Sequence, residues 1–422
     1  MEQGFLFDPN RCTGCQACEL ACTIENELPW GASWRKVSTL DQVHLSLACN
    51  HCGDAPCMEQ CPALAITRND ATAAVLIHED RCIGCGYCSW VCPYDAPVYN
   101  DAAGVMSKCT SCDHRLVEEL DPACVTACPT GCLTWGGLDS EGYVEEIQGF
   151  PQQGIDPAVR FRPLRDDRTV PEMRSWPGED ELLASWVQSA PDTRTPRQNR
   201  RPITPGSEWP LLVFTLGFAG LLAVHARLVV EGGVRFTIPF LAAGVLAMGL
   251  SSLHLGRKLR SWRAVLNFRR SWLSREIVFY SAFIFLAAIW HLAWPGSPAL
   301  GWATLLAGLL GLYSVDRVYD TRSRRPAAGP DSASILFTGG LFIALALGQP
   351  VPAIGILLMK LILYFRNKKP GFFRPVLSIL GILAWAMGAG TLAGAGIVLV
   401  ITAEILDRVV FYRNLAFIHP GA

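Results

Sequence analysis

The sequence carries little charge, and neither sign of charge prevails. Charged residues make up 17% of the 422 residues, and 36 basic against 37 acidic side chains leave a formal net charge of −1. Nucleic-acid-binding proteins show a strongly basic domain or face, so the sequence argues against that class. Half of the residues are hydrophobic, which excludes disorder over most of the length.

Two familiar signatures are also missing. The N-terminal sequence MEQGFLFDPNRC has no basic segment followed by an apolar one, so we expect no export signal. No glycine-rich nucleotide-binding signature follows a predicted strand. We therefore expect no substrate site within this chain, which disfavours a self-contained enzyme.

Cysteine is absent after residue 132, and all 17 cysteines lie between Cys12 and Cys132. This asymmetry divides the chain into two parts of different chemistry. Because no export signal is expected, the thiols should be reduced when the protein folds. Reduced thiols at this density favour metal binding over disulfides.

Sixteen of the cysteines form four sets of four with ferredoxin-like spacing. In bacterial ferredoxins, three closely spaced thiolates hold one 4Fe–4S cluster and the fourth, often followed by proline, binds another cluster. Zinc sites use pairs of cysteines at this spacing and lack the third. We therefore predict four 4Fe–4S clusters. The four sets are Cys12, Cys15, Cys18 and Cys22; Cys49, Cys52, Cys57 and Cys61; Cys82, Cys85, Cys88 and Cys92; and Cys109, Cys112, Cys124 and Cys128.

Residues 1–150 are expected to form an α+β, ferredoxin-like, four-cluster iron–sulfur domain. Residues 72–79 predict a short strand before the third cysteine set. Because such a domain has little apolar core, its clusters should supply much of the folding free energy. Cys132 completes no set, and we expect it to be a buried free thiol near the clusters.

Residues 151–208 are rich in Pro, Arg, Asp and Ser and are expected to be a linker. From residue 209 the sequence consists of apolar runs close to the ~20 residues that cross a bilayer. The runs lack a polar face, which disfavours a soluble helical bundle. We predict an all-α polytopic membrane domain of eight transmembrane helices over 209–413, then a tail at 414–422; two short runs leave seven or nine helices open. The runs lie at about 210–230, 237–255, 277–294, 299–316, 333–349, 351–366, 374–390 and 392–413.

Basic residues gather in the loops on one side of the predicted helices. By the positive-inside rule that side is cytoplasmic, and eight crossings place the cluster domain on the same side of the cell membrane. The opposite side carries only Arg227 and Arg235. The basic loops contain Arg257, Lys258, Arg260, Arg263, Arg269, Arg270, Arg275, Arg317, Arg322, Arg324, Arg325, Arg366, Lys368, Lys369 and Arg374.

His254 and Glu276 stand at adjacent ends of the second and third predicted helices. An ionisable residue in a membrane segment is a functional candidate by default. Quinol oxidation releases two protons with two electrons, so a quinol site needs an imidazole or carboxylate beside the ring oxygens. The alternative is a snorkelling polar cap paired with Arg260 or Arg275, and the residues alone leave both open. Lys360 is expected to snorkel.

His225 and His291 offer a rival cofactor. A b-type haem needs two imidazoles that face each other across helices at similar depth. Both histidines fall toward the side away from the predicted clusters, whereas His254 lies on the near side.

Both parts resemble the dimethyl sulfoxide reductase family of molybdopterin oxidoreductases. The motifs CTGCQAC from Cys12, CNHC from Cys49 and CIGCGYC from Cys82 are similar to its four-cluster electron-transfer subunit. Residues 209–413, with His-Leu-Gly at His254, resemble its eight-helix anchor subunit. The chain is thus identified as a fusion of two subunits that are usually separate.

The resemblance implies how the cysteine sets pair. The first set pairs with the fourth, and the second with the third. Because Cys85 is present, four cubanes are expected rather than a 3Fe–4S cluster. The implied groups are Cys12, Cys15, Cys18 with Cys128; Cys109, Cys112, Cys124 with Cys22; Cys49, Cys52, Cys57 with Cys92; and Cys82, Cys85, Cys88 with Cys61, the last lying nearest the membrane.

The resemblance also implies a quinol site and a partner. His254, Arg260 and Glu276 match the menaquinol motif, although Lys258 stands where the family often has proline. Further candidates for quinone binding (menaquinone or ubiquinone) are Arg317, Tyr319, Glu404 and Arg408. The family lacks haem, so none is expected, and it implies a large molybdopterin catalytic subunit as partner.

Three alternatives stay open. The same electron path could run in reverse in a sulfite-oxidising, quinone-reducing complex. Some relatives work outside the membrane after export with a signal-bearing partner. A membrane-anchored iron–sulfur sensor would need one exposed, labile cluster.

Overall fold

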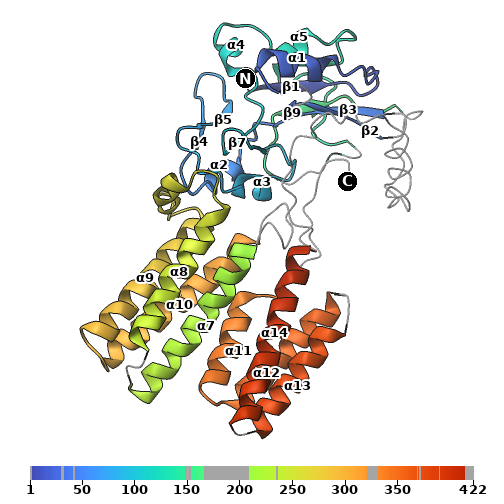
Figure 1. Ribbon diagram of the computed structural model, residues 1–422. Helices are drawn as coiled ribbons and strands as arrows, with labels where there is room; N and C mark the ends of the chain where they lie inside the picture. The colour runs from blue at the N-terminus through green and yellow to red at the C-terminus, as the bar shows by residue number, and fades with distance from the viewer. Residues whose placement is uncertain are drawn as a thin grey trace. The chain divides into compact units, whose positions relative to one another are not determined.

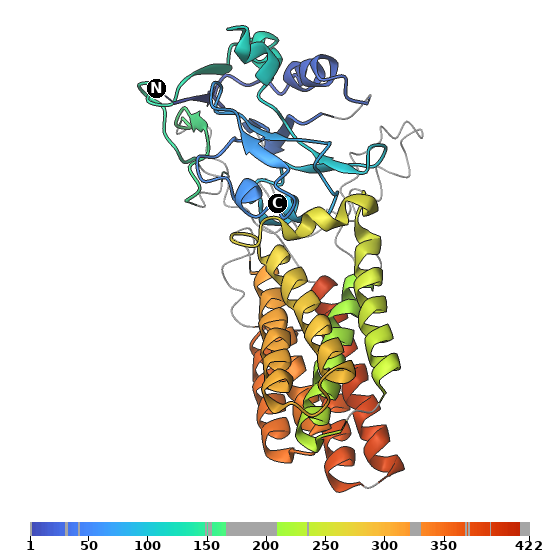
Figure 2. The ribbon, with the colours of Figure 1, turned by 90° about the vertical axis from the view of Figure 1, so that its left-hand side faces the viewer.

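The protein is seen here in a computed structural model, which describes residues 2–29, 33–40, 43–147, 150, 154–165, 209–233, 236–320, 331–367, 369, 372–388 and 390–413. The chain divides into two compact units (Figures 1 and 2). The cysteine unit holds the described residues up to 165 except Gln60–Leu64. The helical unit holds Gln60–Leu64 and the helices from Trp209 onward.

The cysteine unit is built around a small three-stranded sheet of order β8-β1-β9. Strand β1 (Gln3–Phe7) pairs antiparallel with β8 (Leu133–Gly137) and parallel with β9 (Val159–Phe161). Alternate side chains face one core, where the Phe7 and Phe161 rings meet edge to face at 6.5 Å. Strand β9 lies beyond residue 150, so part of the predicted linker joins the sheet because its apolar residues complete this core.

Three hairpins and five short helices make up the rest of the cysteine unit. The predicted strand at 72–79 corresponds to the shorter strand β5, which pairs with β4. The hairpins are β2 (Lys36–Leu40) with β3 (Val43–Leu47), β4 (Ile66–Arg68) with β5 (Val75–Ile77), and β6 (Val98–Asn100) with β7 (Val105–Ser107); the helices are α1 (Ala17–Glu25), α2 (Pro56–Glu59), α3 (Tyr87–Val91), α4 (Asp113–Val117) and α5 (Ala123–Thr126).

The helical unit contains eight α-helices among its described residues, and every predicted apolar run falls on one of them. Figure 1 shows two groups that lie side by side, α7–α10 and α11–α14. Local signals set several starts: the Ser271 hydroxyl caps α9, and proline begins α10 and α12. The helices are α7 (Trp209–Glu231), α8 (Thr237–Ser251), α9 (Trp272–Leu292), α10 (Pro298–Val318), α11 (Ile335–Ala346), α12 (Pro350–Arg366), α13 (Phe373–Met387) and α14 (Thr391–Arg413), with the 3-10 turns η2 (Ser252–His254) and η3 (Lys258–Val265) after α8.

Four helical segments among the described residues are long and apolar enough to cross a membrane. They are α7, Thr237–His254 (α8 with η2), α9 and α10. Helices α11 and α13 are apolar but shorter, and the 12 residues of α11 extend only about 18 Å. Eight crossings therefore stay a prediction for the second group of helices.

Small residues let the helices approach closely. A Cβ atom at Gly308 of α10 would lie 2.4 Å from Leu222 of α7. A Cβ atom at Gly381 of α13 would lie 2.8 Å from the carbonyl oxygen of Gly396 of α14. Such backbone proximity at small residues is typical of helix contacts in membranes.

Candidate functional site

All four cysteine sets share one local geometry. The third cysteine of each set is the second residue of a short helix, in α1, α2, α3 and α5. The residue before the second cysteine has a positive φ in each set, at Gly14, His51, Gly84 and Ser111. This left-handed residue, which costs about 1–2 kcal/mol when it is not glycine, turns the loop toward the helix start. The spacing seen in the sequence therefore has a repeated backbone conformation behind it.

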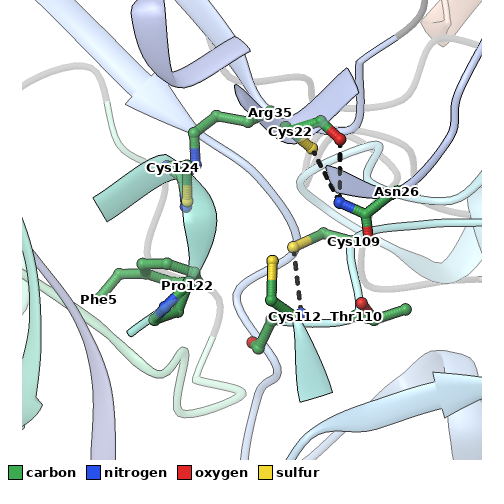
Figure 3. A pocket seen from close by; sticks show the side chains of 10 residues that line it. Phe5, Cys22, Asn26, Arg35, Cys109, Thr110, Cys112, Pro122 and Cys124 are labelled. Carbon is green, nitrogen blue, oxygen red and sulfur yellow. Dashed lines mark hydrogen bonds between the residues drawn. The ribbon is translucent and has the colours of Figure 1, made fainter. Parts of the chain in front are cut away.

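Cys22, Cys109, Cys112 and Cys124 line one pocket (Figure 3). The Ser111 N–H donates to Cys109 Sγ at 3.4 Å, and Asn26 Nδ2 donates to Cys22 Sγ at 3.9 Å. This is the grouping that the resemblance implies for these cysteines. Donors aimed at the sulfur atoms suit thiolate ligands, which carry negative charge.

Cys49, Cys52, Cys57 and Cys92 line a second pocket, again the implied grouping. Burial raises the pKa of Cys57 to about 11, and burial also raises the pKa of Cys52 and Cys92. A buried thiol is stabilised as a thiolate when a nearby positive charge, such as a metal centre, compensates its charge. The donor set therefore fits an iron–sulfur cluster.

Cys12, Cys18 and Cys128 come together as a third group. The Cys12 thiolate feels the charges of both other cysteines, and Cys18 Sγ contacts Ser46 Oγ at 3.3 Å. Cys132 is buried beside the group, with its Sγ 3.5 Å from Cys128 Sγ. A hydrogen bond from Cys132 lowers the pKa of Cys12.

The fourth implied group stays a prediction. Cys82 Sγ accepts hydrogen bonds from the N–H groups of Gly84 and Met106, both at 3.4 Å. Its implied partner, Cys61, belongs to the helical unit. Across the described ranges, no three His, Cys, Asp or Glu side chains converge on a point that would hold a single metal ion.

In the helical unit, Glu276 of α9 lies in a buried group with Arg408 and Tyr319. Arg408 of α14 is close enough for its charge to act on Glu276, and its guanidinium carbon lies 5.2 Å from the centre of the Tyr319 ring. The hydroxyls of Tyr319 and Tyr412 are 2.9 Å apart. Arg408 Nη1 donates to the Ala333 carbonyl at 3.0 Å, and the Arg408 side chain also hydrogen-bonds Tyr412.

His254 and Arg260 lie on the segment that precedes α9. His254 Nδ1 hydrogen-bonds the Ser251 carbonyl, which orients the ring at the end of α8. The described residues show no hydrogen bond between His254 and Glu276. Arg260 lies in η3, half-buried. The structure thus places both residues on the predicted loop.

Arg317 and Glu404 make other contacts. Arg317 pairs with Asp320 and lies 5.3 Å from the Trp272 ring centre. Glu404 is bound by Lys360 Nζ at 2.8 Å and by Arg374 Nη2 at 3.4 Å. The expectation that Lys360 snorkels is wrong, because its fully buried ammonium group pairs with Glu404 inside the helical unit.

One cluster-ligand loop is held within the helical unit. Asn267, between η3 and α9, donates from its side chain to the Cys61 carbonyl at 2.9 Å and from its N–H to the Pro62 carbonyl at 3.2 Å. The same loop connects His254 to Glu276. The segment Gln60–Leu64, which carries Cys61, is therefore fixed to the loop that carries His254 and Arg260.

His225 and His291 meet inside an aromatic cluster. Their ring centroids are 6.0 Å apart, and the Phe240 ring lies 6.2 and 5.2 Å from them. His225 Nε2 contacts the Gly301 carbonyl, and His291 Nδ1 contacts the Thr237 hydroxyl, both at 3.4 Å. The imidazoles are thus packed against rings and hydrogen-bonded, near the end of α8 opposite to His254.

Comparisons with known proteins agree with both halves of the molecule. Residues 40–138 match the family model of the 4Fe-4S dicluster domain, and residues 207–388 match that of the DMSO reductase anchor subunit. One of the chains of the anaerobic dimethyl sulfoxide reductase of Escherichia coli is 38% identical over 154 residues, which cover 33% of this protein and 75% of the relative. This protein belongs to the dimethyl sulfoxide reductase family.

Two further relatives belong to reductases that are named for other substrates. One subunit of the tetrathionate reductase of Salmonella typhimurium is 39% identical over 188 residues, covering 40% of this protein and 75% of the relative. The thiosulfate reductase electron transfer subunit of Salmonella typhi is 40% identical over 162 residues, which cover 35% of this protein and 84% of the relative. This member of the dimethyl sulfoxide reductase family is an electron-transfer and anchor subunit, with an iron–sulfur domain and an anchor domain in one chain.

Sequence reasoning missed four residues around these sites. Tyr412 and Asn267 are a tyrosine on an apolar helix and an amide in a loop, and no motif marks them. Arg35 and Lys108 are buried cations beside the cysteines of this dimethyl sulfoxide reductase family member. Lys108 directly precedes Cys109 in the sequence, and this position is the one sequence signal that could have indicated a charge beside a cluster.

Proposed function

We propose that this subunit carries electrons between membrane quinol and a large molybdopterin catalytic subunit through four 4Fe–4S clusters. One observation carries the proposal: the same chain holds pockets lined by four cysteines in one unit and a buried Glu276–Arg408–Tyr319 group in the other. The first can hold electron carriers, and the second can bind and deprotonate a quinol.

The sixteen cysteines of the four sets are the proposed cluster ligands. Two complete groupings are supported by the pockets, and a third by the contacts among Cys12, Cys18 and Cys128. The fourth grouping, with Cys61, rests on the repeated motif. Bound clusters would supply one-electron redox centres close enough together for electron transfer along the domain.

In the proposed quinol site, Glu276 accepts a proton and Arg408 binds a ring oxygen. Glu276 is 6% exposed, so bulk water does not compete for the proton. The buried guanidinium of Arg408, beside the Tyr319 and Tyr412 rings, is the proposed donor to that ring oxygen. His254 is the proposed acceptor of the second proton, and Tyr319 and Arg260 complete the site.

The loop that contains Asn267 supports electron transfer from this site. Its hydrogen bonds fix the segment of Cys61 to the loop that joins His254 and Glu276. Electron transfer weakens steeply with distance, so the first cluster must lie beside the quinol. The cluster of Cys82, Cys85, Cys88 and Cys61 is therefore the proposed first acceptor.

The proposal also covers the direction of electron flow, the membrane face of the cluster domain and the catalytic partner. The relatives named above are reductases, which favours electron flow from quinol to the catalytic subunit over a sulfite-oxidising direction or a sensor. The basic loops favour the cytoplasmic face of the cell membrane for the cluster domain. The substrate belongs to the catalytic subunit.

A Glu276→Gln variant of the complete complex tests the quinol site. Removing the proton acceptor should slow quinol-driven cluster reduction by about a hundredfold or more, while dithionite still reduces the clusters. Glu231→Gln, an exposed glutamate paired with Arg227, is the matched control and should behave as the wild type. The measurement is stopped-flow absorbance of cluster reduction by a menaquinol analogue.

Unchanged quinol kinetics in both Glu276→Gln and Arg408→Gln would remove this group from the site. Iron and molybdenum are counted in the same preparations. About sixteen irons beyond those of the partner agree with four clusters. A complex without molybdenum or a large partner chain would overturn the proposed role.

A further inference from the structure

We propose that Arg35 and Lys108 are charge-tuning residues that raise the reduction potentials of the clusters next to them. The inference rests on the proposed clusters and goes beyond the ligand assignment. Each cysteine-lined pocket contains one buried cation: Arg35 lines the pocket of Cys109, and Lys108 lines the pocket of Cys49.

Arg35 lies at the edge of its pocket, just before β2 (Figure 3). The residue is 2% exposed, and Nη1 donates to the Ser46 carbonyl at 3.0 Å. The guanidinium carbon lies 4.4 Å from the centre of the Phe5 ring. In the described part of the chain, Nε and Nη2 donate no hydrogen bond and no carboxylate forms an ion pair with Arg35.

Four cysteines and one carboxylate, that of Glu19, act electrostatically on Arg35. Ser46 Oγ lies 3.3 Å from both Arg35 Nη1 and Cys18 Sγ. Arg35 also lines the pocket of Cys22, Cys109 and Cys124, so it lies among thiolates. The four cysteines come from two implied cluster groups, since Cys18 belongs to the first group and the others to the group of Cys109. The contributing cysteines are Cys124, Cys109, Cys18 and Cys22.

Lys108 occupies the equivalent position between the next two groups. It is 3% exposed, and its ammonium group donates to the carbonyls of Val75 and Cys109. Lys108 lines the pocket of Cys49 and Cys57, and the cysteines Cys49, Cys57 and Cys109 act electrostatically on its charge. Lys108 forms no ion pair with a carboxylate within the described ranges.

The two cations therefore stand at the two junctions between three successive cluster groups. The order is the group of Cys12, then Arg35, the group of Cys109, then Lys108, and the group of Cys49. Reduction adds a negative charge to a cluster, and a fixed positive charge in a buried setting stabilises the reduced form. The pair keeps the inner clusters easy to reduce, which favours electron passage through the middle of the domain.

Neutral variants of the complete complex test the proposal. Arg35→Met and Lys108→Met should each lower the midpoint potential of at least one cluster, with a tenfold or greater change in the reduced-to-oxidised ratio. A tenfold change corresponds to about 59 mV for a one-electron centre. Arg35→Lys and Lys108→Arg, which keep the charge, should stay close to the wild type. The measurement is a redox titration followed by EPR.

Arg162→Met is the matched control, because Arg162 is an exposed arginine of the same unit and water screens its charge. Unchanged midpoints in both neutral variants at full iron content would overturn the proposal. A second outcome would also overturn the proposal. If both neutral variants lose iron while the charge-keeping variants keep normal iron content and normal midpoint potentials, the two cations serve cluster assembly. Failure of the proposed function is separate: it would appear in the wild type, as missing iron or as clusters that quinol does not reduce.

Discussion

At the scale of single residues, Cys132 is a buried thiol that lies beside a proposed cluster ligand. It is four residues from Cys128, and its Sγ is 3.5 Å from that of Cys128. Cys12, Cys15, Cys18 and Cys128 are the four ligands proposed for this cluster. Cys132 is therefore placed to donate a weak S–H hydrogen bond to a ligand, and such bonds influence cluster potentials.

Cys132→Ala should leave the iron content of the complex unchanged, because no ligand is lost. Cys128→Ala, four residues away, should remove or convert one cluster and lower the iron count. Iron per chain and the EPR spectrum of the reduced complex measure both effects. A loss of about four irons from Cys132→Ala would make Cys132 a ligand and contradict the assignment of Cys128.

At the scale of elements, buried ion pairs join the last three helices, α12, α13 and α14. Glu404 and Asp407 of α14 face Lys360 of α12 and Arg374 of α13, and Lys369 binds Asp407 at 2.8 Å. All five side chains are almost fully buried. Buried charges persist when they are paired, so the network accounts for the two carboxylates, Glu404 and Asp407, on α14. Glu404 is thereby engaged in helix packing.

Helices α13 and α14 also meet through glycine. Gly381→Ala would place a Cβ 2.8 Å from the Gly396 carbonyl, so the helices must separate, at a cost of about 1–3 kcal/mol. Gly394→Ala is the matched control in α14, because a Cβ there meets nothing within 4 Å. Thermal denaturation in detergent should show a lower midpoint for Gly381→Ala alone. Equal midpoints for the two variants would contradict this packing.

At the scale of the whole molecule, the two units depend on different forces. The core of the cysteine unit contains Cys92, Cys124 and Cys132 beside Phe5, Phe7 and Phe161, so ligands and apolar residues share one core. The helical unit is held by apolar helices and paired charges. Loss of the clusters should therefore affect the first unit much more than the second.

Removal of iron by chelation without denaturant should unfold the cysteine unit while α7–α14 stay helical. Hydrogen exchange followed by mass spectrometry measures both regions in one sample. We expect protection to be lost in β1 and β8 and retained in α9 and α10. Retained protection in β1 and β8 after complete iron loss would show that the apolar core suffices without clusters.

The cysteine sets and the apolar helices each depend on residues that are close together in the sequence, so both could be predicted from it. The cysteine sets follow from ligand spacing within one loop, and each apolar run became a helix because its residues are contiguous. The matches to an iron–sulfur domain and an anchor domain confirm the predicted family. Glu276, Tyr319 and Arg408 were all named as site candidates, but nothing in the sequence showed that they would meet.

By itself, the sequence determined the chemistry: which thiols can bind clusters, where the apolar helices lie, and which ionisable residues accompany them. Only the tertiary structure decided which residues share a site. It brought Arg408 to Glu276, engaged Glu404 with Lys360, and buried Arg35 and Lys108 among thiols. The physical reason is that burial and charge pairing act through space, between residues far apart along the chain, whereas spacing and hydropathy act along it.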